Sequence, residues 1–158
     1  MTQIHDLRSF IRVLEDAGQL VRIKQPVSLT YELADVAATL VRRGVGASLF
    51  ENVEGCQWPI FAGGVANQKR AALALGCQES EVTAVMGRVL EPSSAVPPVR
   101  VESAKWHTNV QTGDRIDVRE LPIPTHSRGD GGPFITGGVI VSKDPISGRG
   151  NLSYNNTP

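Results

Sequence analysis

The fold class is decided by residues 20–50, which read LVRIKQPVSLTYELADVAATLVRRGVGASLF. Residues 20–24 alternate and are rich in β-branched side chains, so they predict a strand. Apolar residues then recur with the period of a helix, and Thr30 is expected to cap that helix. Ser48-Leu49-Phe50 predicts the next strand. A strand, a helix and a strand in succession are typical of an α/β layer structure.

The residues on either side continue this alternation. Upstream, Asp6 is suited to cap a helix that carries apolar residues at helical spacing as far as Leu14 and ends at Gly18. Downstream, the pattern predicts a strand and two helices: residues 59–62, residues 67–75, and a helix capped by Ser80 that stops at Pro92. Residues 1–91 are therefore predicted to form an N-terminal α/β domain.

The composition changes after residue 91. Residues 92–98 form a proline-rich connector, which we expect to be stiff and extended. From residue 99 the helical period is lost. A turn and a strand are predicted for residues 113–118, and a hairpin for residues 134–155. Since so short a hairpin buries little surface alone, residues 99–158 are expected to open a β domain that more chain or a partner completes. The predicted fold class is α+β.

The overall composition excludes several classes of protein. The 158 residues are 41% hydrophobic and 20% charged, with 16 basic and 16 acidic side chains and a pI near 6.8. This balance gives no electrostatic footprint for nucleic acid or an anionic membrane. No apolar run approaches the length of a membrane span. Cys56 and Cys77 are too few for a disulfide framework, which favours a reducing, cytoplasmic location.

Residues 126–138, HSRGDGGPFITGG, are the most unusual segment. Glycines let backbone amides approach a ligand, and Arg128 could pair with a phosphate or a carboxylate. The alternative is a long turn with a solvated pair between Arg128 and Asp130. His126 could be an acid, a base or a ligand, or simply a hydrogen-bonded surface group.

The last strand candidate places Asn151, Ser153 and Asn155 on one face. Three polar side chains in a row suit a hard cation or a polar ligand, and equally suit an ordinary solvent face. Asparagine oxygen is neutral, so a divalent ion here would need carboxylates from elsewhere. No paired catalytic carboxylates, Ser/His/Asp set or nucleophilic cysteine is discernible, and the two cysteines are interpreted as small, half-buried hydrophobic residues.

Taken together, four segments resemble the N-terminal part of the UbiD family of decarboxylases. They are DLRSF (6–10) with GQLVRI (18–23), SLFENV (48–53), LPIP (121–124) with GDGGPFIT (129–136), and NLS (151–153). The resemblance implies a second domain of the split β-barrel, flavin-reductase-like kind. It also implies a non-oxidative, often reversible decarboxylase of aromatic or α,β-unsaturated carboxylic acids. The third and fourth segments are specific in combination and in order.

The resemblance also implies cofactors and site residues. Members of the family use prenylated FMN, made by a flavin prenyltransferase, with a divalent metal, usually Mn²⁺, and often K⁺. By resemblance Asn151 is the metal ligand at the cofactor phosphate. Residues on the flavin side are Thr136, Ser153, Tyr154, Asn155 and Asn156. The cofactor serves as the electron sink while CO₂ leaves, and the protein holds and protonates.

Two departures from the family pattern matter. The family has an arginine beside the substrate carboxylate five residues after the metal-ligating asparagine, where this chain has Asn156, which supplies no charged clamp. The family's other metal ligands and its acid–base glutamates lie beyond residue 158, so we expect one metal ligand and no complete active site in this chain. Two alternatives remain open: a split subunit or assembly module, completed as a homo-oligomer or by another chain, and an FMN-binding barrel module without decarboxylase chemistry.

Overall fold

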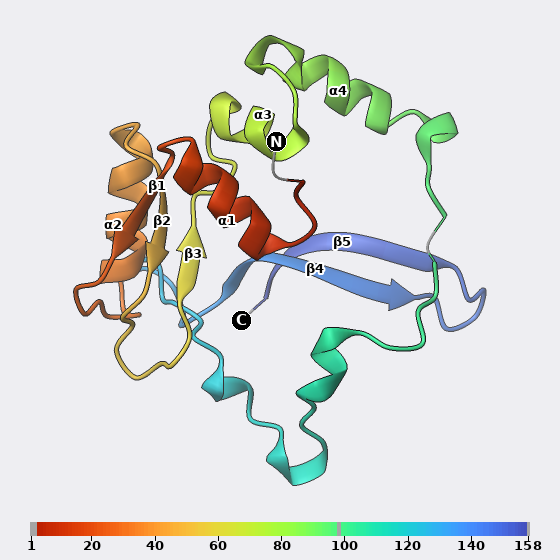
Figure 1. Cartoon of the computed structure of the whole chain (residues 1–158). Helices are drawn as coiled ribbons and strands as arrows, with labels where there is room; N and C mark the ends of the chain where they lie inside the picture. The colour runs from red at the N-terminus through yellow and green to blue at the C-terminus, as the bar shows by residue number, and fades with distance from the viewer. Residues whose placement is uncertain (1–2, 98, 158) are drawn as a thin grey trace.

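The computed structural model describes residues 3–97 and 99–157, with side chains for all of these except residues 105, 106 and 155–157 (Figure 1). The helices are α1 (Leu7–Asp16), α2 (Glu32–Arg42), α3 (Gln68–Leu75) and α4 (Val82–Val89). The strands are β1 (Leu20–Ile23), β2 (Ala47–Phe50), β3 (Ile60–Ala62), β4 (Ile135–Lys143) and β5 (Gly150–Thr157). The predicted α+β class is confirmed.

The N-terminal sheet has the order β1-β2-β3. Strand β1 runs parallel to β2, with Leu20 opposite Ala47, and β3 runs antiparallel to β2, with Ile60 opposite Phe50. Helices cover both faces, because Phe10 and Leu14 of α1 pack with Ala47 whereas Leu33 of α2 packs with Phe50. All of β2 is buried, as expected for a central strand covered on both sides.

Helix starts were predicted with mixed success. Asp6 caps α1 with a capping box, and Asn67 caps α3. The prediction for Thr30 is wrong, because α2 begins after Tyr31, which has a φ of 68° and makes no side-chain cap. The prediction for Ser80 is also wrong. It lies inside a 3-10 turn, Glu79–Glu81, which precedes α4.

The segment between the sheet and the hairpin departs from the predicted strand. Residues 113–118 contain a 3-10 turn, Gly113–Arg115, and enter a second one, Val118–Glu120. A strand needs a neighbour for its ladder hydrogen bonds, and the described chain places none beside these residues. The connector is not fully extended either, because Pro92–Ser94 forms a 3-10 turn, and its last residue, Pro98, lies outside the described residues.

The predicted hairpin is confirmed. Strands β4 and β5 pair antiparallel, with a register shift between Ile135 and Gly138. One face of this pair is apolar and exposed: Val141 is 77% exposed, Leu152 69% and Tyr154 81%. Among the described helices none is long and apolar enough to cross a membrane.

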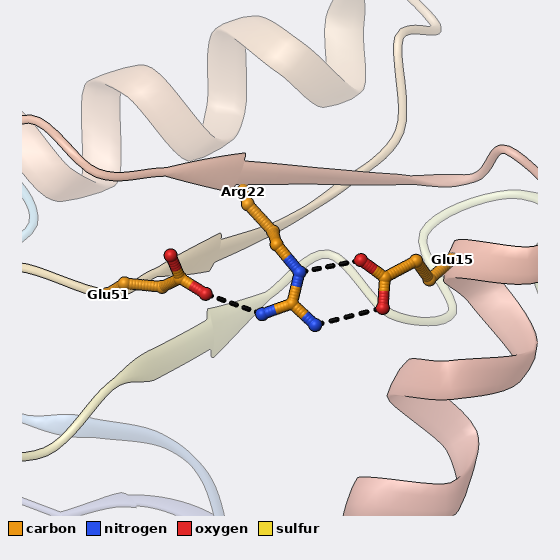
Figure 2. Close-up of polar contacts among 3 residues, drawn as sticks. All are labelled: Glu15, Arg22 and Glu51. Carbon is orange, nitrogen blue, oxygen red and sulfur yellow. Dashed lines mark hydrogen bonds and ion pairs between the residues drawn. The ribbon is translucent and has the colours of Figure 1, made fainter.

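Arg22 of β1 forms ion pairs with carboxylates from two other parts of the N-terminal unit (Figure 2). Its Nε and Nη2 donate to the two carboxylate oxygens of Glu15 at 2.6 and 2.9 Å, and its Nη1 donates to Glu51. Glu15 belongs to α1, whereas Glu51 directly follows β2. The guanidinium therefore connects a helix to two strands at the surface, and both carboxylates raise its pKa.

Acid is expected to weaken this connection. The pKa of Glu15 lies below its ordinary value of 4.5, chiefly because Arg22 donates hydrogen bonds to it and secondly through the charge of Arg22. The unfolded chain therefore takes up this proton at a higher pH than the folded chain does. The stabilisation is present above the unfolded pKa and is lost as the pH falls through the folded one. Because the pair is exposed, we expect a small effect.

Urea unfolding of the wild type and of Glu15→Gln, measured from neutral pH to about pH 3, tests this expectation. The wild type should have the higher midpoint at neutral pH, and the two midpoints should converge in acid. The exposed Glu102→Gln is the control and should follow the wild type throughout. A constant offset between Glu15→Gln and the wild type would contradict the prediction.

Candidate functional site

A strap, residues 122–126, attaches the second half of the chain to α2. The Tyr31 amide donates to the Thr125 carbonyl at 2.9 Å, and the Thr125 amide donates to the Leu29 carbonyl at 3.1 Å. Thr30 and Thr125 thus form a parallel bridge. In Figure 1 this segment, drawn in cyan, passes the α2 side of the sheet before it enters β4. The glycine-rich segment that follows is therefore anchored to the N-terminal unit at its start.

The glycine-rich segment closes on itself. The Phe134 amide donates to the Pro124 carbonyl at 3.3 Å, and the rings of His126 and Phe134 lie 4.7 Å apart. Inside the loop, Asp130 accepts a hydrogen bond from the Ser127 amide at 2.7 Å. Among the described residues Arg128 forms no ion pair with Asp130, so the solvated pair that we considered is not observed. Arg128 is exposed.

A cavity of about 320 Å³ lies between the strap, the start of β4, and the N-terminal unit. Its walls include Leu33 and Ala37 of α2, Phe61 of β3, and Ile123 of the strap, so it is largely apolar. His126 lines it as well. The Nδ1 atom of His126 is shielded from solvent and has no hydrogen-bond partner. Nδ1 of the half-buried His126 therefore makes no hydrogen bond, and the ring packs against Phe134.

The hairpin brings together some of the predicted site residues. Asn151 lies opposite Ser142, and Ser153 lies opposite Ile140, so Asn151 and Ser153 share a face of β5. Tyr154, opposite Val139, is on the other face. The side chains of Asn155 and Asn156 lie outside the described residues, although the backbone of Asn155 pairs with Gly138.

Thr136 is not part of the regular ladder between β4 and β5. It falls within the register shift between Ile135 and Gly138, is exposed, and borders the cavity. A register shift leaves local backbone groups free of the ladder and re-aims side chains. Thr136 is therefore on the strand that precedes the Asn151 strand, but at the end near His126, whereas Asn151 is near the hairpin tip, so the two residues lie at opposite ends of the hairpin.

Asn151 borders an open recess at the tip of the hairpin. The recess is lined by Ser142, Lys143, Asp144, Ser147, Arg149, Gly150 and Asn151. One oxygen of Asp144 accepts hydrogen bonds from the Ile146 and Ser147 amides and from the Ser147 hydroxyl. These bonds, led by those from Ser147, lower the pKa of Asp144. The Asp144 carboxylate therefore stabilises the turn between β4 and β5.

This donor set fits part of a flavin phosphate and metal centre. Two cationic side chains, a hydroxyl and an amide suit a phosphate, and the Asn151 oxygen suits one position around a hard cation. Within the described residues there is no group of three or more His, Cys, Asp or Glu side chains that could hold a metal ion. Lys143 and Arg149, two basic residues that flank one hairpin turn, line the same recess and were not singled out from the sequence.

Two family models match the chain in succession. One, described as the 3-octaprenyl-4-hydroxybenzoate carboxy-lyase N-terminal domain, matches residues 11–91. The other, described as the 3-octaprenyl-4-hydroxybenzoate carboxy-lyase Rift-related domain, matches residues 98–156. The α/β unit thus corresponds to the first of these domains, and the glycine-rich loop with the hairpin falls within the second. The chain belongs to the UbiD family and corresponds to its N-terminal portion.

Solved structures of UbiD-class enzymes resemble the chain along nearly its whole length. An evolved dimeric form of HmfF from Pelotomaculum thermopropionicum, in complex with prFMN, is 28% identical, with a TM-score of 0.80 over 97% of this chain and 35% of that one. Apo 3,4-dihydroxybenzoic acid decarboxylase (AroY) from Klebsiella pneumoniae is 28% identical, with a TM-score of 0.77 over 96% and 34%.

Vanillic acid decarboxylase from Sedimentibacter hydroxybenzoicus, in an open form with truncated ShVdcD, is 26% identical. Its TM-score is 0.84, and the match covers 98% of this chain and 36% of that chain. The chain therefore spans about a third of the length of the structures that it matches.

Proposed function

We propose that the chain is the N-terminal part of a prenylated-FMN-dependent decarboxylase of aromatic or α,β-unsaturated carboxylic acids. The observation that carries this proposal is the succession of the two family matches, over 11–91 and 98–156. Similar structures that hold prFMN or FMN support the flavin. We further propose domain boundaries at 1–91 and 99–158 with the connector 92–98, a cytoplasmic location, and a flavin prenyltransferase as cofactor supplier.

Within this proposal several residues of the hairpin have a defined task. The bound flavin supplies the electron sink for loss of CO₂. Asn151 would offer its side-chain oxygen to a divalent ion, Mn²⁺ or one like it, and K⁺ would be a second cation. Lys143 and Arg149 would offset the charge of the cofactor phosphate. Thr136, Ser153, Tyr154, Asn155 and Asn156 would line the flavin side, with Tyr154 on the opposite face of β5 from Ser153.

A second candidate function is a catalytically incomplete subunit or assembly module that another chain completes. The exposed apolar face of the hairpin, with Val141, Leu152 and Tyr154, favours this candidate. A contiguous apolar face of this kind is typical of a surface that packs against further protein. The two candidates differ in whether further acid–base and metal-binding groups belong to the same polypeptide or to a partner.

Co-expression with a flavin prenyltransferase tests the proposal. We expect the full coding region that contains this chain to purify with flavin absorbance and with manganese at one equivalent each, and to decarboxylate an aromatic acid. The 158-residue chain expressed alone is the comparison. Flavin and metal on that chain alone would favour completion by association, whereas a colourless and inactive full-length product would contradict the proposed function.

A further inference from the structure

Tyr31 has an unusual backbone at the start of α2. Its φ of 68° and ψ of −43° lie in a region that L-residues rarely adopt, and Tyr31 is the only non-glycine residue with positive φ among those described. The Glu32 amide donates to the Thr30 carbonyl at 2.9 Å. Together these values define a γ-turn of the strained kind. A conformation of this cost persists only where the surroundings over-determine it.

Side chains on both sides hold this turn. The Glu32 carboxylate accepts from the Ser28 amide at 2.8 Å, and the Ser28 hydroxyl accepts from the Thr30 amide at 3.1 Å. The Leu33 amide donates to the Ser28 carbonyl at 3.1 Å. As a result the Tyr31 amide is directed out of the helix, to the Thr125 carbonyl of the strap, instead of being left as a free helix-end donor.

The attachment of the strap at Thr125 also constrains the start of β4, the end of the hairpin where Thr136 lies. The loop after the strap is closed by the Phe134–Pro124 hydrogen bond and by the contact of the His126 and Phe134 rings. Thr136 follows Phe134 by two residues. Because the cavity separates the strap from α2 and β3, side-chain packing between them is incomplete, and the two backbone hydrogen bonds at Thr125 bear more of the attachment.

We propose that Tyr31 is a positioning residue, whose strained turn holds the strap and thereby places Thr136. Only the last step, from Thr136 to the flavin, rests on the proposed function. If the strap separates from α2, the Tyr31 amide loses its hydrogen bond to the Thr125 carbonyl. The strained backbone of Tyr31 then relaxes. The position of β4 relative to the N-terminal sheet is therefore coupled to one backbone conformation at the start of α2.

Amide hydrogen exchange measured by NMR on the 158-residue chain tests the proposal without any cofactor. Tyr31→Pro removes the amide donor and fixes φ near −65°. We expect the Thr125 amide to exchange at least about tenfold faster in this variant, and the Phe134 and Thr136 resonances to shift, while Ala37 in α2 stays protected. Leu7→Pro, at the first position of α1 where proline is tolerated, is the matched control and should change none of these signals.

A second pair of variants isolates the backbone strain. Tyr31→Gly and Tyr31→Ala both lack the ring and both keep the amide, but only glycine adopts positive φ freely. We expect the Thr125 amide to exchange about tenfold more slowly in the glycine variant than in the alanine variant. Equal rates would overturn the proposal, including in the case where Tyr31→Pro does not fold. Faster Thr125 exchange with unmoved Phe134 and Thr136 signals would overturn it as well.

Flavin absorbance of the full coding region separates this inference from the proposed function. If the wild type takes up flavin, Tyr31→Pro should shift the flavin absorption band or reduce flavin occupancy more than Leu7→Pro does, and an unchanged spectrum would overturn the step to the flavin. If the wild type takes up none, the proposed function fails, while the exchange rates still decide whether Tyr31 positions the strap.

Discussion

Replacing Phe50 by alanine is expected to lower the free energy of unfolding by about 3–5 kcal/mol, the largest stability effect of any single change considered for this chain. Phe50 lies on the central strand β2 and is 0% exposed, with Val27, Leu33 and Val53 packed around it. The lost transfer energy and the cavity left behind both contribute. Native domains are stable by only about 5–15 kcal/mol, so the variant should be near the limit of folding.

Urea unfolding followed by far-UV circular dichroism checks this prediction. Val141→Ala is the control, because Val141 is also on a strand but is 77% exposed, and its midpoint should stay close to that of the wild type. Equal midpoints for Phe50→Ala and the wild type would show that this cluster is not the core of the N-terminal unit.

Replacing Asn151 by alanine in the complete enzyme is expected to have the largest effect on function. Changes to residues that merely orient metal ligands cost about 10–100-fold in affinity or activity, so loss of a ligand should cost at least as much. Asn151→Asp keeps an oxygen donor and adds a negative charge, so it should alter manganese affinity without abolishing it. Metal content and flavin absorbance of the purified variants are the measurements.

Ile146→Ala is the control for the hairpin, since Ile146 is at its tip, 96% exposed, and outside the proposed site. It should retain metal and flavin at wild-type levels. Manganese and cofactor retention in Asn151→Ala equal to that of Ile146→Ala would remove Asn151 from the metal site.

The local sequence pattern was sufficient to predict features that depend only on residues close together in the chain. The cap at Asp6, the helix within residues 67–75 and the order of strands and helices up to Phe50 followed from spacing alone. The shared face of Asn151 and Ser153 followed from the two-residue period of a strand. The strand predicted within 113–118 failed, because a strand also requires a neighbour that local pattern does not reveal.

The features that only the tertiary structure decided depend on contacts between distant parts of the chain. Thr30 has the side chain of a helix cap, yet the strap residue Thr125 bonds to the Tyr31 amide and a γ-turn replaces the cap. His126 has the sequence context of a surface loop, yet its half-buried ring packs against Phe134. The sequence by itself determined the order of strands and helices up to Phe50 and the faces of the hairpin, since these follow from periods of two and 3.6 residues. The attachment of the hairpin to the N-terminal unit was decided by backbone hydrogen bonds, which any residue other than proline can donate and which therefore leave no mark in side-chain identity.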